Sequence, residues 1–340
     1  GKTMLALIDG FPAGLTVDTD AIDAELRRRQ GGYGRGGQQK LETDAVEFLT
    51  GTWQSVTLGS PNTVQVINRD YKLERLKDLP RPRPGHGDLS GSVKYLSSIR
   101  GILERASARD TASRVAAGAL AQQLLSQFGI RSFGYVVQLG GIDIPVPDQK
   151  LESLLDARSK SEVYSLMPEK DDEIKALIDQ TKTQGDTLGG VVEVCVTGLP
   201  FGLGTHAQWD RKLDTRLAAA AMSVQAIKGV EIGLGFQAAA LPGSQVHDAI
   251  HFDEDQQRTN TLGYTRPTNN AGGLEAGMTN GQPLVLRAAM KPISTLQKSL
   301  DSIDMETKAP SSASYERSDI CAVPAASVIM EAVVALEIAA

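Results

Sequence analysis

Residues 111–128 read Thr-Ala-Ser-Arg-Val-Ala-Ala-Gly-Ala-Leu-Ala-Gln-Gln-Leu-Leu-Ser-Gln-Phe, and Gly129 follows them. Alanine and leucine are strong helix formers, and glycine is the usual residue just past a helix C-terminus. The stretch therefore predicts a helix that ends at Phe128. Its surface is small-sided and largely apolar, and such a helix packs closely against neighbours on several sides. We predict that this helix lies in the interior of the fold.

A second alanine-rich segment occurs later in the chain. It predicts an interior helix from Asp214 to Lys228, stopped by Gly229. Two segments rich in β-branched residues, 190–197 and 283–287, predict strands. The sequence therefore predicts a chain that contains both helices and strands.

The N-terminal third follows the same pattern. An apolar segment over 4–17 is interrupted by a glycine-rich turn and predicts short strands, and Asp18 to Asp20 offer N-caps for a helix through Arg28. Residues 146–182 are polar and are expected at the periphery. Residues 240–282 are rich in Gly, Asn, Thr and Pro and are expected to form long functional loops.

Composition limits the classes of function. The chain has 340 residues, 41% of them hydrophobic, and a net charge of −6. An acidic chain is a poor general ligand for nucleic acid or for anionic membranes. Cys195 and Cys321 are far apart, and no Cys/His group has the spacing of a metal site. We therefore expect a reduced, cytoplasmic protein without a metal, with both termini trimmed.

One run is basic although the chain is acidic. Residues 27–37 hold four arginines and five glycines. Arginine presents paired donors to phosphate and carboxylate oxygens, and glycine lets the backbone approach a ligand closely. Later segments repeat this chemistry, so we predict a site for a small polyanion that one domain assembles from arginines beside Gly, Ser or Pro: Arg29, Arg35, Arg83, Arg109 and Arg317. Solvated surface arginines are the alternative for each residue taken singly.

Two titratable residues accompany the arginines. His86 lies in a proline-glycine turn, which suits a general acid or a hydrogen-bond donor to a bound anion. Asp319 follows Arg317 by two residues, and a carboxylate inside an anion site suggests proton transfer. A structural turn histidine and a simple ion pair are the alternatives. Residues 291–295 and 269–281 could hold a phosphate or a planar cofactor, or form ordinary turns.

Taken in order, these segments resemble the chorismate synthase family over nearly the whole chain. The matching segments are Gly10 to Leu15, Arg28 to Gly37, Arg83 to His86, Glu104 to Ala112, Val115 to Gly118, Lys228 to Gly233, Asn269 to Gly281, Lys291 to Thr295 and Glu316 to Ala326. The resemblance implies a single domain over 1–340, an α/β (α+β) fold in the form of a β-α-β sandwich with central helices between antiparallel sheets, and a homotetramer. It implies elimination of phosphate from 5-enolpyruvylshikimate 3-phosphate to give chorismate, with reduced FMN as cofactor.

The resemblance also implies residue roles. His86 and Asp319 would be catalytic, as an acid near the substrate and as the acid/base serving flavin N5. The arginines Arg29, Arg35, Arg83, Arg109 and Arg317 would hold the substrate or the flavin phosphate. The flavin would be lined by Arg105, Ala106, Ser107, Gln225, Ala226, Ala276, Lys291, Pro292, Ile293, Ser294, Thr295 and Arg317.

The chain departs from the family pattern at several positions. The N-terminal Gly-Glu-Ser-His-Gly motif is not in the sequence, although Gly1 can be its last glycine. Gly87 replaces a usual alanine, Gln225 a common asparagine and Ala276 a glycine. Two other interpretations stay open: a flavin reductase or other flavoprotein using NADPH, and an RNA-binding module of the RGG type carried by residues 27–37.

Overall fold

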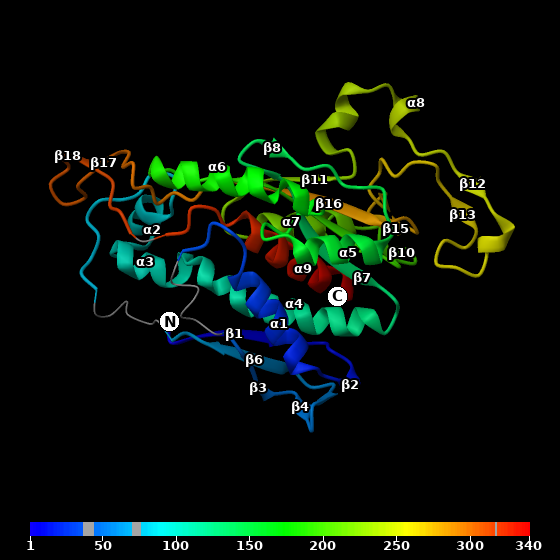
Figure 1. Cartoon of the computed structure of the whole chain (residues 1–340). Helices are drawn as coiled ribbons and strands as arrows, with labels where there is room; N and C mark the ends of the chain where they lie inside the picture. Colours follow the sequence, from blue (N-terminus) through cyan, green and yellow to red (C-terminus); the bar gives the residue numbers. More distant parts are fainter. Residues whose placement is uncertain (37–43, 70–75, 317) are drawn as a thin grey trace.

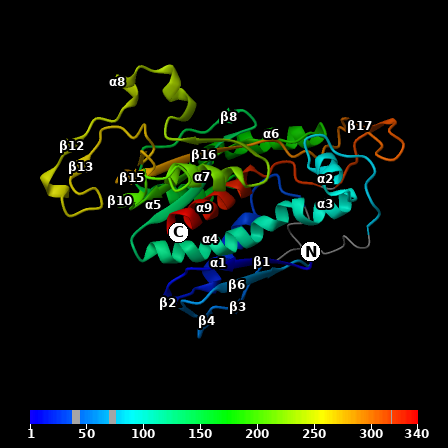
Figure 2. The same ribbon diagram turned by 180° about the vertical axis from the view of Figure 1, so that it is seen from behind.

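The structure is a computed structural model that describes residues 1–36, 44–69, 76–316 and 318–340. Two antiparallel sheets enclose a layer of helices, as Figure 1 shows from one side and Figure 2 from behind. This arrangement confirms the α/β sandwich with central helices that the family resemblance implied.

The smaller sheet contains three strands in the order β1-β6-β3. Val64 and Val66 of β6 are buried against the helices, whereas Leu5 and Leu7 of β1 point outward and are exposed. A short three-stranded sheet, ordered β2-β5-β4, continues from it. The bounds are β1 Thr3–Ile8, β2 Ala13–Thr16, β3 Val46–Thr50, β4 Thr52–Trp53, β5 Val56–Leu58 and β6 Asn62–Ile67.

The larger sheet has five strands in the order β11-β16-β9-β7-β8. Val192, Val194 and Val196 of β9 are fully buried on the face toward the helices. Glu193 points to the opposite face and pairs with Arg287 of β16 at 2.6 Å. The bounds are β7 Arg131–Leu139, β8 Ile142–Asp143, β9 Gly190–Thr197, β11 Ile227–Ile232 and β16 Leu284–Met290, close to the strands predicted over 190–197 and 283–287.

The helices between the sheets are α1, α4, α7 and α9. Helix α4 packs on β1 and β6, and α9 packs on β7 and β9, with α4 and α9 in contact along their lengths. A Cβ at Gly118 of α4 would lie 2.5 Å from the Cβ of Ala332 in α9, so the two backbones approach closely. The bounds are α1 Thr19–Gln30, α4 Thr111–Ser126, α7 Leu213–Met222 and α9 Val323–Ala339.

Three sequence predictions for these helices can now be compared with the structure. Asp18 caps α1 as expected, accepting a hydrogen bond from Ala21 N at 3.0 Å. Helix α4 lies in the interior and ends within two residues of the predicted position. The helix predicted to run to Lys228 ends instead at Met222, and β11 begins at Ile227. One face of α7 is exposed, so only part of it belongs to the interior.

A buried ion-pair network ties α1 to α9. Glu331 of α9 is 2% exposed and accepts hydrogen bonds from Arg28 at 2.6 Å and Arg158 at 2.9 Å. The Gly134 backbone N–H of β7 donates to the same carboxylate at 2.8 Å. Burial acts to raise the pKa of Glu331, but the two guanidinium groups hold it below its usual value. Burial and the Glu331 charge instead raise the pKa of nearby Glu25.

The remaining helices lie around this sandwich. Leu154 of α5 covers Phe133 and Tyr135 on the outer face of the larger sheet, as expected for a peripheral segment. Helix α6 buries Ile174 and Ile178. The bounds are α2 Asp88–Tyr95, α3 Ile99–Ala106, α5 Leu151–Lys160, α6 Asp171–Thr183 and α8 Gly243–Val246, with 3-10 turns η2 Ala108–Asp110, η3 Pro168–Lys170, η4 Gly235–Ala240 and η5 Glu254–Gln256.

The predicted long loops form a projection from the sandwich. In Figures 1 and 2, α8, β12 and β13 extend away from the layers. An aromatic group joins this projection to β10, with Tyr264 of β13 packed between Phe201 of β10 and Phe252 of β12. The remaining strands are β10 Phe201–Gly204, β12 His251–Phe252, β13 Tyr264–Thr265, β14 Leu274–Glu275, β15 Met278–Asn280, β17 Asp301–Ile303 and β18 Pro310–Ser312.

Candidate active site

Arg83, His86 and Asp88 form a compact cluster at the start of α2. Gly85 has φ +76° and turns the chain, so that His86 N can donate to Arg83 O at 3.2 Å. Asp88 accepts from Arg83 Nε at 2.8 Å and from Arg83 Nη2 at 2.9 Å. His86 Nδ1 lies 2.6 Å from Asp88 Oδ1. The predicted anion-binding arginine and the predicted acid are therefore linked through one carboxylate.

Asp88 is fully buried and remains charged. Burial acts to raise its pKa, but the hydrogen bonds from His86 and Arg83 outweigh burial and lower the pKa well below 3.8. An ionised carboxylate with these partners holds the His86 ring in a fixed orientation. The ring itself remains partly exposed, at 23% of its side-chain surface.

The 291–295 segment joins this cluster from the far end of the chain. Arg83 Nη1 donates to Thr295 Oγ1 at 3.0 Å, and Lys291 Nζ donates to Gly85 O. Burial and the neighbouring Lys228 charge lower the pKa of Lys291. The structure thus gathers His86, Lys291 and Thr295 around Arg83, although they are about two hundred residues apart in sequence.

Gln225 and Ala226 lie beside the same segment. Ala226 O accepts from Lys291 N at 2.9 Å, and Ala226 has φ +69°, which alanine seldom adopts. The side-chain oxygen of Gln225 is buried and has no hydrogen-bond partner among the described residues. A buried acceptor without a donor costs free energy unless a ligand supplies one.

Asp319 occupies a second cluster with Arg35. Arg35 Nη1 lies 2.7 Å from Asp319 Oδ2, and Gly36 N donates to Asp319 Oδ1 at 2.6 Å. The following residue connects the two clusters, since Ile320 O accepts from Leu188 N at 3.0 Å. Gly189 then lies against the backbone of Met290 and Lys291. Asp319 is therefore joined to the 291–295 segment through one short stretch of backbone.

Arg29 and Arg109 form a third cluster around Asp44. Arg109 donates to both oxygens of Asp44 through its two Nη atoms, and Arg29 Nη1 lies 3.6 Å from Asp44 Oδ2. Arg29 also donates from Nε to Thr111 Oγ1 at 2.9 Å. The Asp44 side chain is 1% exposed. Two arginines predicted to bind an anionic ligand thus share the carboxylate of Asp44.

The other predicted positions divide into three groups. Ala106 is the last residue of α3, which also contains Arg105, and Ser107 caps η2 by accepting from Arg109 N at 3.2 Å, so they lie beside the third cluster. Arg317 lies outside the described residues. Ala276 lies in the turn between β14 and β15. The next residue, Gly277, accepts a hydrogen bond through its carbonyl oxygen from Leu213 N at the start of α7. Lys291 directly follows the last residue of β16, whereas the β14–β15 hairpin that contains Ala276 packs near the first residue of β16. The two residues therefore lie apart within one chain.

Several residues of these clusters were not predicted from the sequence. Asp88 could have been found from the sequence His86-Gly87-Asp88, because this spacing places two polar side chains in one turn. Lys228 was predicted only as a helix end, and nothing near Asp44 in the sequence indicates that it pairs with Arg109, 65 residues away. This pair forms because Asp44, which follows α1 in the chain, lies beside the start of α4 in the fold. Local sequence does not predict that contact.

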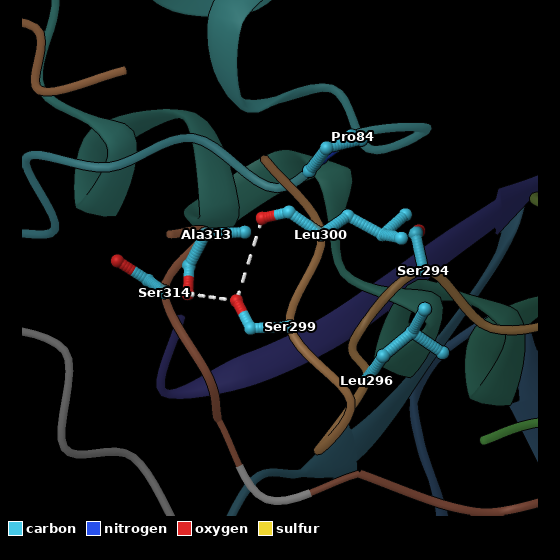
Figure 3. Close-up of a pocket in the computed structure, with 7 residues that line it drawn as sticks. All are labelled: Pro84, Ser294, Leu296, Ser299, Leu300, Ala313 and Ser314. Carbon is cyan, nitrogen blue, oxygen red and sulfur yellow. Dashed lines mark hydrogen bonds between the residues drawn. The ribbon is translucent and has the colours of Figure 1, made fainter. Parts of the chain in front are cut away.

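Two depressions lie next to the 291–295 segment. Figure 3 shows a cavity lined by Pro84, Ser294, Leu296, Ser299, Leu300, Ala313 and Ser314, with Ser299 Oγ donating to Ala313 O at 3.0 Å. Its volume of about 10 Å³ has room for one water molecule at most. A larger, open depression of about 370 Å³ is lined by backbone and apolar groups that include Gly189, Met290 and Pro292.

Comparison with known proteins identifies the family of this chain. A family model described as chorismate synthase matches residues 1–340. The chain belongs to the chorismate synthase family. The chorismate synthases of Geobacter metallireducens and Geobacter sulfurreducens are 53% and 51% identical to it over 353 residues, covering all of this chain and 90% of each relative. That of Enterococcus faecalis is 48% identical over 355 residues with the same coverage.

A solved structure supports the same assignment. A crystal structure of a chorismate synthase matches this chain with a TM-score of 0.80 and 42% sequence identity, covering all of this chain and 87% of that one. Membership of the chorismate synthase family confirms the resemblance found in the sequence motifs and implies a lyase that acts on a small molecule. No helix in the described parts of the chain is long and apolar enough to cross a membrane.

The residues present fit the flavin that the chorismate synthase family implies. The buried Gln225 oxygen needs an N–H or O–H donor, which a flavin ring offers. Beside it, Lys291 offers a positively charged side chain to an anionic group, and Ala226 is held at φ +69°. The chemistry of Gln225 and Lys291 is therefore compatible with a bound flavin.

Proposed function

We propose that this protein is a chorismate synthase that removes phosphate from 5-enolpyruvylshikimate 3-phosphate by anti-1,4-elimination. The product is chorismate, the reaction is that of a carbon-oxygen lyase acting on phosphates, and the step is the last of the shikimate pathway toward aromatic amino acids. The observation that carries the proposal is the gathering of His86, Lys291 and Thr295 around Arg83, in a chain that matches the family over its whole length.

The substrate has two carboxylates and one phosphate. Its charges require several cationic contacts, which the five predicted arginines supply. Arg109 donates to both oxygens of Asp44, and Arg29 Nη1 lies 3.6 Å from one of them; a substrate carboxylate or phosphate would take the place of Asp44 between these two arginines. Lys291 adds a point charge at the edge of the His86 cluster.

Two residues move protons in this proposal. His86, oriented by Asp88, donates a proton to a substrate oxygen as the phosphate leaves. Asp319, held by Arg35 and Gly36 N, would be the base that takes up, by way of flavin N5, the proton that the substrate ring loses as the new double bond forms. Reduced FMN, when bound by Gln225, Ala226 and residues 291–295, supplies electron density to the substrate as phosphate departs. The buried position of Asp88 keeps the acid's orienting partner away from water.

The decisive experiment is anaerobic phosphate release from 5-enolpyruvylshikimate 3-phosphate, with and without reduced FMN. The expected result is release coupled to chorismate formation, only when reduced FMN is present. His86→Ala should lose most of this turnover while it still binds FMN. Folded protein that binds FMN but releases no phosphate would refute the proposal. Oxidation of NADPH without chorismate formation would support the flavin-reductase alternative.

The assembly and location are proposed on the same basis. The outer face of the smaller sheet leaves four large apolar side chains exposed: Leu5, Leu7, Leu49 and Ile67. Such a face is suited to burial against another copy, as in the homotetramer implied by the family. We place the protein in the cytoplasm, with a small-molecule substrate and with neither nucleic acid nor a membrane as partner. Light scattering that gives a monomer mass at micromolar concentration would refute the tetramer.

A further inference from the structure

The direction of the hydrogen bond between His86 and Asp88 follows from charge. His86 Nδ1 lies 2.6 Å from Asp88 Oδ1, and hydrogen bonds from His86 and Arg83 keep the pKa of Asp88 low in spite of burial. An ionised carboxylate can only accept hydrogen bonds. The hydrogen in this bond is therefore carried by His86 Nδ1.

Arg83 prevents Asp88 from turning away. It donates to the carboxylate from its backbone N at 3.0 Å, from Nε at 2.8 Å and from Nη2 at 2.9 Å. Arg83 Nη2 also lies 3.3 Å from His86 Nδ1. Because a guanidinium cannot accept, and Nδ1 already donates to Asp88, this last contact is not an additional hydrogen bond. Asp88 thus receives donors from both neighbours and has one stable orientation.

We propose that Asp88 is a positioning residue that fixes the tautomer of His86, with the proton on Nδ1, so that the ring exchanges its mobile proton with the substrate through Nε2. The inference rests on the proposed function for the acid role of His86. It assigns to Arg83 a second task, which is to hold Asp88 in place. Nδ1 faces the buried Asp88, whereas the ring keeps 23% of its side-chain surface exposed, and Nε2 has no hydrogen-bond partner among the described residues.

Asp88→Asn separates this role from simple packing. Asparagine has the same shape, but one of its two terminal atoms is a donor. Two Arg83 donors, the backbone N and Nε, face Oδ2, so the asparagine oxygen should take that position. Its NH₂ then takes the Oδ1 position, which faces His86 Nδ1 and the single remaining donor, Arg83 Nη2. Nδ1 must then accept, and the proton moves to Nε2. The same exchange in the serine-protease triad costs turnover a factor of about 10⁴.

The test is a nitrogen-15 NMR spectrum of the full chain with labelled histidine, at alkaline pH where imidazoles are neutral. A His86→Gln spectrum identifies the His86 signals among the four histidines. The expected result is a protonated Nδ1 in the unsubstituted protein and a protonated Nε2 in Asp88→Asn. Asp88→Glu, which keeps the acceptor, should retain the original tautomer and serves as a second variant if Asp88→Asn does not fold.

Ser302→Ala is the matched control. Ser302 Oγ donates to Pro82 O at 2.6 Å, beside Arg83, so its loss loosens the same loop without touching Asp88. Ser302→Ala should keep both the tautomer and the turnover. Asp88→Asn should lower kcat by roughly 10²- to 10⁴-fold with little change in KM.

Three results would overturn the inference. They are an unsubstituted protein with the proton on Nε2, an Asp88→Asn variant with an unchanged tautomer, and the same tautomer change in Ser302→Ala. The spectra need neither substrate nor flavin. Failure of the proposed reaction would therefore leave the tautomer result intact, and the two failures can be told apart.

Discussion

Gly118 of α4 and Ala332 of α9 are in direct contact across the centre of the fold. A Cβ added to Gly118 would lie 2.5 Å from both the Cβ and the carbonyl oxygen of Ala332. Helix α4 also reaches the third arginine cluster, because its first residue, Thr111, accepts from Arg29 and Arg109 lies in η2 directly before it. A shift of α4 would therefore affect that cluster as well as the core.

Gly118→Ala is expected to destabilise the protein by roughly 1 to 3 kcal/mol. In an unobstructed helix the same change would stabilise by about 0.5 to 1 kcal/mol, so the sign tests the contact. Gly229→Ala is the control, because a Cβ at that position would meet only the Cβ of Ala289, at an ordinary contact distance of 3.6 Å. Urea unfolding should show a lower free energy of unfolding for Gly118→Ala alone; a gain at Gly118 would contradict the close packing.

Asp44→Asn should make the thermal stability of the protein depend on added anions. The substitution leaves the Arg29 and Arg109 charges without their shared carboxylate, so the melting temperature should fall in low-salt buffer. Inorganic phosphate should then raise the melting temperature of Asp44→Asn more than that of the unsubstituted protein. Asp23→Asn is the control, since Asp23 only accepts from Val46 N on the same segment. Equal phosphate shifts in all three proteins would show that no anion replaces Asp44.

Glu331→Gln should be much more harmful than Glu25→Gln. Loss of the Glu331 charge leaves Arg158 without its carboxylate and Arg28 with Glu25 alone, in a largely buried place, at a cost of roughly 3 to 5 kcal/mol. Burial and the Glu331 charge raise the pKa of Glu25, so its ionised form is disfavoured in the folded state and its removal should cost little. Denaturant unfolding of both variants at neutral pH measures the difference, and equal losses would disprove the distinction.

The low pKa of Asp88 predicts a pH dependence of stability. Hydrogen bonds from His86 and Arg83 lower this pKa below 3.8 despite burial, so the unfolded chain takes up the proton first as the pH falls. The stabilisation is therefore complete well above pH 3.8 and is lost as the pH falls below it. The difference in unfolding free energy between the unsubstituted protein and Asp88→Asn should shrink from pH 6 to pH 3; a constant difference would be inconsistent with an ionised, paired Asp88.

Asp319→Asn should separate proton transfer from flavin binding. Asparagine keeps one acceptor oxygen for the Gly36 N–H, so the local backbone should be retained, but its NH₂ replaces the oxygen that faces Arg35 and this ion pair is lost. Turnover should fall by roughly 10²-fold or more, the usual range for a lost acid or base. Flavin fluorescence titration should give nearly unchanged FMN binding. Loss of FMN binding would make Asp319 a structural residue.

The sequence was informative where local chemistry determines the structure. Gly129 follows the predicted α4 closely, with φ +70°, and the β-branched run over 190–197 is strand β9. Helix α9 was not assigned, because it is apolar on all sides and has no amphipathic period. Helix α7 was predicted too long, because the pairing of Ile227 with Met290 in the sheet takes over the residues beyond Met222.

The site was predicted less completely than the fold. Single residues such as His86 and Lys291 could be selected from their turn sequences, and the structure places both at Arg83. Their carboxylate partners could not be selected, because the pairing of Asp44 with Arg109 is set by the contact between distant segments. Ala276 remains a prediction, and its place at the other end of β16 gives it no contact with Lys291 in one chain.

The carboxylates that accompany the arginines affect how fast an anionic substrate arrives. Arg35 and Arg83 are each paired with an aspartate, and Arg29 and Arg109 share one, so these four positive charges face three negative ones. The whole chain carries a charge of −6. Long-range attraction of a trianion is then weak, and capture should proceed at an ordinary diffusive rate. Added salt should leave the association rate constant nearly unchanged or raise it slightly, rather than reduce it steeply as in electrostatically steered enzymes.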